Sequence, residues 1–157
     1  MSVIDEIDAK IVDLLMGNGR MNAAEIARRV EEITERAVRY RIKRMESEGV
    51  IRICAIPNPK ILGYSVIADV FIEVESGRIL EVAHKLADME CISYVACSIG
   101  ETDISAQIIA HNSDEVYAIV TQVIGKIQGV RKTTTSIVPL VLKDVYEWHI
   151  PRSLFSK

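Results

Sequence analysis

The sequence lacks the features of membrane, exported and disulfide-rich proteins. No segment approaches the roughly 20 consecutive apolar residues of a membrane-spanning helix. The acidic start, residues 1–10, does not have the basic-then-apolar layout of a signal peptide. Cys54, Cys91 and Cys97 are odd in number and have no CxxC spacing, which argues against a disulfide framework or a zinc site. We therefore expect a cytoplasmic protein with three buried thiols.

Recognisable catalytic and cofactor-binding motifs are also missing. His84, His111 and His149 are scattered along the chain, and none has a nearby nucleophile in the sequence. There is no HExxH motif and no glycine-rich phosphate loop. We therefore predict that the chain is not an enzyme and binds no metal or other cofactor.

The first third of the chain has the hydrophobic period of helices. Apolar residues recur at helical spacing from residue 4 to 49, and Asn22 and Thr34 are N-caps for the second and third of three short helices. A strand is expected at 52–56, before Pro57-Asn58-Pro59 breaks the pattern. This order predicts a helix-turn-helix domain of the winged-helix-like type.

The hydrophobic period changes to two after Tyr64. Strands are expected at 65–74, 92–99, 103–111 and 130–142, with helices from about 76 to 87 and from 113 to 129. The order is βαββαβ, a ferredoxin-like arrangement with both helices on one face of the sheet. Residues such as Ile67 and Phe71, or their alternates along the strand, would then leave the other face apolar. We expect that face to be covered by dimerisation, sheet on sheet.

The whole chain is therefore predicted to be an α+β protein with four segments. These are a helix-turn-helix domain at 1–52, a strand linker or hinge at 53–64, an oligomerisation and sensing domain at 65–142, and a tail at 143–157. The tail carries Tyr146 and Trp148 among charged residues, and we expect it to pack on a neighbouring subunit.

The third predicted helix has a basic face. At about 100° per residue, Val38, Ile42 and Met45 point inward. The outward and flanking candidates for DNA contact are Arg36, Arg39, Tyr40, Lys43 and Arg44. Arginine can donate two hydrogen bonds to guanine or bind phosphate, and a local basic patch suffices even though the net charge is −3. The alternative is that this is an ordinary solvated helix face. Arg28, Arg29 and Arg52 are further candidates for phosphate contact, and for them the solvated alternative is about equally favoured.

A second candidate site lies at the loop between the second and third predicted strands. Gly100 permits positive φ, loop N–H groups could bind a carboxylate, and Asp103 could accept a hydrogen bond from an α-ammonium group. Thr133 and Thr135 share one face of the last strand. The alternative is a tight hairpin in which Asp103 bonds its own turn.

Taken in order, these residues resemble the Lrp/AsnC (feast/famine) transcription regulators. The likeness is carried by Ile4 to Ile11, by Ala24-Glu25-Ile26-Ala27, by Val38 to Ile51, by Leu62-Gly63-Tyr64, by Gly100-Glu101-Thr102-Asp103, and by Ile127 to Val130 with Thr133, Thr135 and Ile137. Compared with the family pattern, the turn at 30–35 is one residue longer and has no Gly-Leu-Ser, and Thr102 replaces a common aromatic residue.

The resemblance implies a sequence-specific regulator that binds double-stranded DNA and senses a small molecule. It implies homodimers that assemble further, to tetramers or octamers, through a C-terminal domain of the RAM type. It also implies an amino acid or related metabolite bound between dimers. The effector-site residues would be Gly100, Glu101, Thr102, Asp103, Thr133 and Thr135. Two alternatives are an architectural or ligand-sensing DNA-binding oligomer without strong sequence preference, and an enzyme similar to tetrapyrrole decarboxylases.

Overall fold

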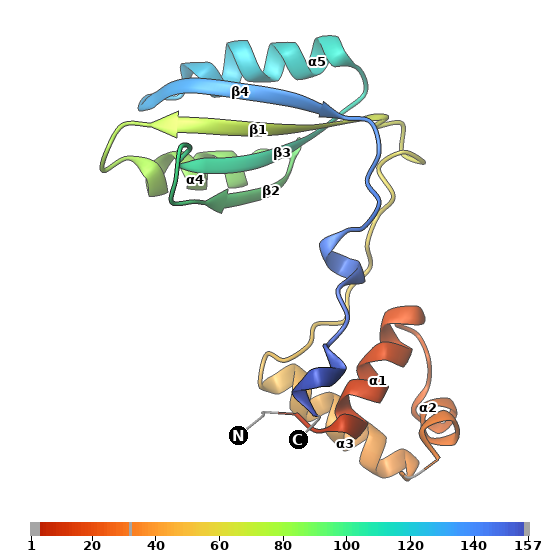
Figure 1. Cartoon of the computed structure of the whole chain (residues 1–157). Coiled ribbons are helices and arrows are strands. Elements are labelled where there is room, and N and C mark those ends of the chain that lie inside the picture. Colours follow the sequence, from red (N-terminus) through yellow and green to blue (C-terminus); the bar gives the residue numbers. More distant parts are fainter. Residues whose placement is uncertain (1–3, 32, 156–157) are drawn as a thin grey trace. The chain divides into compact units, whose positions relative to one another are not determined.

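The computed structural model of the chain describes residues 4–31 and 33–155. The chain forms two compact units (Figure 1). The first combines the segment that ends at Ile56 with the segment that begins at Lys143, and the second runs from Pro57 to Leu142. Within the described residues, no helix has the length and apolar character needed to cross a bilayer.

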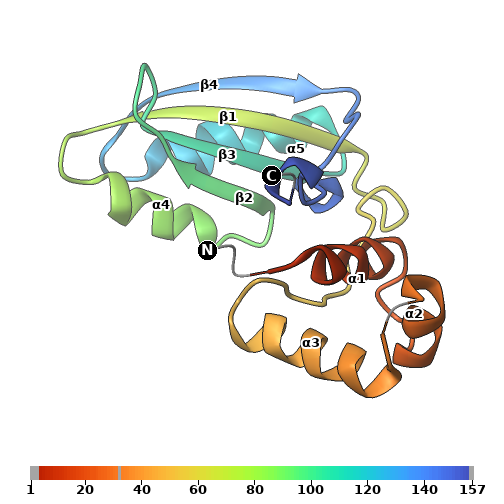
Figure 2. The ribbon, with the colours of Figure 1, turned by 60° about the horizontal axis from the view of Figure 1, so that its bottom comes forward.

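Three helices make up most of the first unit: α1 (Glu6–Gly17), α2 (Ala23–Val30) and α3 (Glu35–Ser47) (Figure 2). Each begins at a side chain that accepts a hydrogen bond from the first turn, namely Asp5, Asn22 and Thr34. Their inward faces share one apolar core, formed by Ile11, Val12, Leu15, Ile26, Val30, Val38 and Met45. The predicted helix-turn-helix is confirmed.

The second unit is a four-stranded antiparallel sheet in the order β2-β3-β1-β4. Its strands are β1 (Val66–Val74), β2 (Ile92–Cys97), β3 (Ile104–Ala110) and β4 (Val130–Val138), with α4 (Ile79–Ala87) and α5 (Ser113–Ala118). The chain continues from α5 through the π-helical turn η1 (Ile119–Val123) and the 3-10 turn η2 (Ile124–Lys126). Residues from both helices and from alternate positions of β1 and β3 form one core, which confirms the predicted α+β, βαββαβ fold.

The other face of the sheet carries no helix from this core. Phe71 and Tyr94 are exposed there, beside Ile67 and Ile109. A polar row crosses the same face, because Gln107 Nε2 donates to Asp69 Oδ1 (3.0 Å) and Ser93 Oγ donates to Gln107 Oε1 (3.2 Å). We call this surface the open sheet face.

Some predicted element boundaries were wrong. Residues 52–56 are exposed and form no strand, because a strand needs a partner and none pairs with this segment within the described chain. The last strand stops at Val138 because Pro139 has no N–H to donate to the sheet. The long helix expected at 113–129 is α-helical only to Ala118, since Ile119 to Ile124 is rich in β-branched residues.

The cysteine prediction was also wrong for two of the three residues. Cys54 and Cys97 are exposed, the first in the irregular segment after α3 and the second at the end of the edge strand β2. Cys91 is partly buried, and this burial raises the pKa of its thiol.

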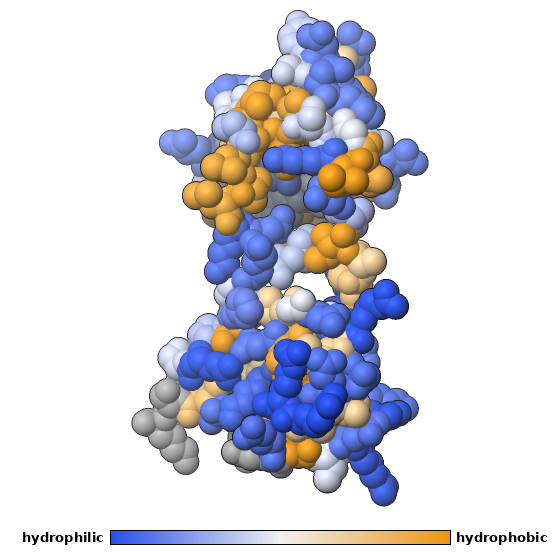
Figure 3. All heavy atoms as spheres, turned by 90° about the vertical axis from the view of Figure 1, so that its right-hand side faces the viewer, coloured by the Kyte–Doolittle hydropathy of each residue, from blue (hydrophilic) through white to orange (hydrophobic). Residues whose placement is uncertain are grey.

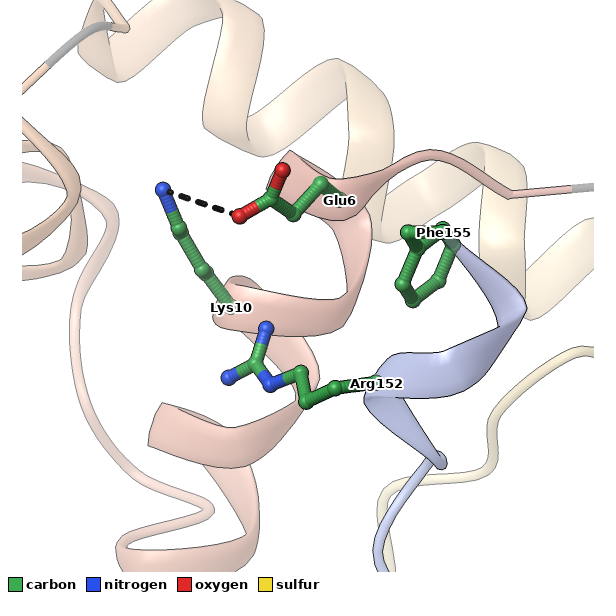
Figure 4. Close-up of a pocket in the computed structure, with 4 residues that line it drawn as sticks. All are labelled: Glu6, Lys10, Arg152 and Phe155. Atoms are coloured by element: carbon green, nitrogen blue, oxygen red, sulfur yellow. Dashed lines mark ion pairs between the residues drawn. The ribbon is translucent and has the colours of Figure 1, made fainter. Parts of the chain in front are cut away.

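The tail packs on the first unit of its own chain, where we had expected contact with a neighbouring subunit. It contains the 3-10 turns η3 (Val145–Glu147) and η4 (Arg152–Leu154). Ile150 joins the helical core. His149 and Arg152 bind the two carboxylate oxygens of Asp13 on α1, at 3.1 and 2.5 Å. Arg152 and Phe155 line a pocket of about 330 Å³ together with Glu6 and Lys10 of α1 (Figure 4).

Candidate DNA-binding and effector sites

Packing on the core fixes which face α3 presents to solvent. The Thr34 hydroxyl accepts a hydrogen bond from the Ala37 N–H (3.3 Å) and so starts the helix. Val38 and Met45 are fully buried, and Ile42 packs at the margin of the same core. These three anchors leave the opposite face of the helix in solvent.

Four of the five predicted DNA contacts lie on that solvent face: Arg36, Arg39, Tyr40 and Lys43 are exposed. Tyr40 keeps 68% of its surface accessible although it is aromatic. Arg39 forms an ion pair with Glu35 one turn earlier. Arg36 and Lys43 have no ion-pair partner among the described residues. This face can therefore offer two unpaired cations and an aromatic hydroxyl to an anionic groove.

Arg44 is placed differently. Its side chain is 28% exposed, and Nη2 lies 2.5 Å from Oδ2 of Asp8 on α1. Arg41 Nη1 binds the other oxygen of Asp8 (2.8 Å) and also Asp5 Oδ2 (2.7 Å). The sequence interpretation assigned no role to Asp8 or Arg41. The matched spacing of Asp5 with Asp8 and of Arg41 with Arg44, each three residues apart on a helix, is a signal that could have suggested the pairing.

Two members of this cluster have shifted pKa values. Burial raises the pKa of Asp5, but the Asp8 N–H and the Arg41 guanidinium more than offset this and hold it below the usual value. Hydrogen bonds to Asp8 and Asp5 raise the pKa of Arg41. Both shifts favour the charged forms of the Asp5–Arg41 pair.

The turn between α2 and α3 contains a backbone conformation that is unusual for its residue. Glu31 ends α2 with φ at 65°, the left-handed region that glycine adopts most easily, and its N–H donates to Ala27 O (3.1 Å). Glu32, the other acidic residue of the unusually long turn, lies outside the described residues. Nearby, Arg29 pairs with Glu25 (2.7 Å), while Arg28 and Arg52 are exposed.

The loop between β2 and β3 is held to the sheet by Asp103. Its N–H donates to Ile72 O (3.0 Å), and its Oδ2 accepts from the Val74 N–H (2.7 Å). Ser98 Oγ donates to Thr102 O (2.8 Å) and closes the base of the loop. Gly100, at φ 157°, and Glu101 are exposed at the tip. One carboxylate oxygen of Asp103 therefore already accepts a hydrogen bond from the neighbouring strand β1.

The predicted effector residues are not gathered into one pocket within a single chain. Thr133 and Thr135 pair with Ile72 and Val70 of β1, whereas the Asp103 loop leads into β3 on the other side of β1. Two strand spacings, about 10 Å, separate them. Two pockets among the described residues lie elsewhere: one is at Glu6 and Arg152, and another is at the end of the sheet where β1 begins and β4 ends.

That end of the sheet also exposes apolar side chains. Figure 3 views this side, with apolar groups gathered on the second unit. The exposed apolar residues that precede β1 and follow β4 include Ile61, Leu62, Leu140 and Leu142. No group of three or more His, Cys, Asp or Glu residues suited to a metal ion occurs in the part of the chain that the structure describes.

Comparison with known proteins identifies both units. The AsnC-type helix-turn-helix domain matches residues 4–46, and the Lrp/AsnC ligand binding domain matches residues 67–147. The chain belongs to the Lrp/AsnC family of transcription regulators. Both domains of an Lrp/AsnC regulator are therefore present, in the order that the sequence predicted.

Similar proteins agree over nearly the whole chain. The transcriptional regulator FL11 of Pyrococcus furiosus is 36% identical over 92% of this chain and 95% of its own. LrpA of Pyrococcus horikoshii is 36% identical over 90% of this chain and all of its own. These Lrp/AsnC relatives are named as transcriptional regulators and not as enzymes, in line with the prediction that the chain is not an enzyme.

Solved structures show the same Lrp/AsnC fold. AsnC of E. coli matches with a TM-score of 0.83 at 24% identity, over 92% of this chain and 99% of that one. The regulator NMB0573 of Neisseria meningitidis, solved in complex with L-Met, matches with a TM-score of 0.87 at 21% identity, over 98% of this chain and all of that one.

Proposed function

We propose that this Lrp/AsnC regulator binds specific double-stranded DNA sites by placing α3 in the major groove, with Arg36, Arg39, Tyr40 and Lys43 toward the duplex. The observation that carries the proposal is the separation of faces on α3: the apolar anchors are buried, while these four side chains are exposed. An α-helix fits the major groove, and Arg and Lys are the side chains that most often contact guanine there.

Sequence preference can be measured with a duplex that the protein itself selects from a random pool, compared with a shuffled duplex of equal composition. Lys43→Gln is expected to weaken binding to the selected duplex by about 1–3 kcal/mol, or roughly 5- to 150-fold, without a change in oligomer size. Lys85→Gln, an equal loss of charge on α4, should leave affinity unchanged. Uniform binding of both duplexes by the unaltered protein would favour the architectural alternative.

The small molecule is proposed to be an amino acid, bound near the loop of Gly100, Glu101, Thr102 and Asp103 together with Thr133 and Thr135. Support comes from the match to the ligand binding domain and from the L-Met complex of a regulator with the same fold. Because the loop and the two threonines lie on opposite sides of β1, a second copy of the chain is needed to complete an enclosed site.

Thermal unfolding in the presence of each of the twenty amino acids tests this proposal. An amino acid at 100 times its Kd adds about 2.7 kcal/mol of stability and should raise the melting temperature. Thr133→Val keeps the side-chain shape but removes the hydroxyl, and is expected to abolish that shift without lowering the melting temperature of the free protein. If no amino acid raises the melting temperature, the effector class is wrong.

We also propose that the chain forms a homodimer through the open sheet face and that dimers assemble further, to tetramers or octamers. The support is the apolar surface of Phe71, Tyr94, Ile67 and Ile109, on which no described helix of the second unit packs. A second copy would bury it.

A further inference from the structure

The single buried charged residue among the described residues is Asp8, on the first helix of the DNA-binding unit. Its side chain is 1% exposed. A buried carboxylate is unfavourable unless it is paired and hydrogen-bonded. Here the Asp5 N–H donates to Oδ2 (3.0 Å), and the N-terminal turn of α1 favours negative charge. The remaining partners of Asp8 both come from α3.

Those partners are two guanidinium groups, one on each carboxylate oxygen. Arg41 Nη1 donates to Oδ1 at 2.8 Å, and Arg44 Nη2 donates to Oδ2 at 2.5 Å. Arg41 has a second acid, Asp5, at 2.7 Å, whereas Arg44 depends mainly on Asp8. Glu48 is 3.8 Å from Arg44 Nε, too far for a hydrogen bond, and this Nε is buried without a hydrogen-bond partner. Arg44 is thus held to α1 through one end of its guanidinium group.

The arrangement divides the basic residues of α3 into two sets. Arg36 and Lys43 are exposed and unpaired within the described chain, while Arg41 and Arg44 are turned toward α1 and neutralised there. Charges that stay free to contact phosphate add affinity for any sequence, since each contact releases counterions regardless of the bases. Withholding two arginines from phosphate therefore lowers affinity for every DNA sequence by a similar factor and leaves the reading of bases to the exposed set.

We propose that Asp8 is a positioning residue that fixes α3 against α1 and withholds Arg44 and Arg41 from the DNA backbone, so that base contacts by the exposed set dominate specificity. This inference rests on the proposed placement of α3 in the groove. It assigns Arg44, a DNA contact in the sequence prediction, to the α1–α3 contact.

The experiment measures the slope of log affinity against log salt concentration for the selected and shuffled duplexes. In Asp8→Asn, Arg41 keeps Asp5 while Arg44 is released. The slope should steepen by about 0.9, the amount expected for one added phosphate contact. Between 50 and 200 mM salt, the variant should therefore lose about 3.5-fold more affinity than the unaltered protein. Because the added contact is with phosphate, both duplexes should gain affinity at low salt by a similar factor. Glu6→Gln removes an equal charge from the exposed face of the same helix and should change neither quantity.

A purely structural role for Asp8 would weaken binding without steepening the slope, so an unchanged or shallower slope in a folded Asp8→Asn protein overturns the proposal. The double variant Asp8→Asn with Arg44→Gln should return the slope to its original value. Restoration of that kind cannot come from loosened packing.

Arg44→Gln alone provides a readout that does not require Asp8→Asn to fold. Because Arg44 makes no phosphate contact in the intact protein, this variant should leave the slope unchanged, and a loss of about 0.9 overturns the proposal. The variant Lys43→Gln distinguishes failure of the role proposed for Asp8 from failure of the proposed DNA binding by α3. If Lys43→Gln weakens selective binding while Arg44→Gln also loses a contact, only the role of Asp8 fails. If Lys43→Gln leaves selective binding unchanged, the placement of α3 in the groove fails, and the role of Asp8, which rests on it, fails with it.

Discussion

Deletion of residues 143–157 is expected to destabilise the DNA-binding unit, although the deleted segment is nearly a hundred residues away from α3 in the sequence. The tail contributes Ile150 to the helical core, and its His149 and Arg152 side chains contact Asp13 of α1. Loss of a partly buried isoleucine and of these polar contacts should lower the unfolding free energy of the first unit by about 2 kcal/mol. Denaturant unfolding followed by circular dichroism of the helices measures the change, and DNA affinity should fall with it.

Two single substitutions locate the effect within the tail. Ile150→Ser should reproduce most of the loss, because this side chain packs on the core. Val145→Ser is the matched control, since Val145 is 73% exposed in the same tail and should tolerate the change. Equal stability of the shortened and full-length chains would mean that the tail does not support the first unit. A smaller oligomer with unchanged helix stability would instead favour the original expectation of contact with a neighbouring subunit.

Phe71→Glu is expected to have the largest effect on assembly. Phe71 lies on the open sheet face, which we propose as the dimer interface. A carboxylate buried there without a partner should cost about 3 kcal/mol or more and raise the dimer Kd at least about a hundredfold. Analytical ultracentrifugation across a concentration series should then detect monomers at concentrations where the unaltered chain is fully associated.

Leu80→Glu is the control for this substitution. Leu80 is 68% exposed on α4, on the helix-covered side of the sheet. The substitution Leu80→Glu therefore adds the same charge away from the proposed interface. Its sedimentation should match that of the unaltered protein. If Phe71→Glu also sediments unchanged, the open sheet face is not the dimer contact, and the exposed apolar residues beside the start of β1 and the end of β4 become the next candidates.

Local signals were sufficient for most of the fold. Asn22, Thr34 and Asn112 each begin a helix in the structure as their side-chain chemistry requires. The period of two in β1 and β3 predicted one core face on each strand, because successive residues in a strand point to opposite faces, but it did not determine which alternate set enters the core. Val38 and Met45 were predicted to be buried on the same periodic grounds.

The errors share a different physical origin. Residues 52–56 have strand-forming composition but remain irregular, because backbone pairing depends on a partner strand that no local pattern supplies. Cys54 and Cys97 were expected to be buried from the average preference of cysteine, yet both are exposed. Such averages do not report the position of a residue in the fold.

By itself, the sequence determined the helix-turn-helix, the βαββαβ order and the exposed basic face of α3, since capping and periodicity act over a few residues. Tertiary structure alone decided which of those basic residues are free. Asp8 and Arg44 are 36 residues apart, and their ion pair exists only because the shared apolar core brings α1 against α3. The same holds for Asp13 and Arg152, which are 139 residues apart. Contacts of this kind depend on the folded chain, so the spacing of charged residues in the sequence can suggest them but does not establish them.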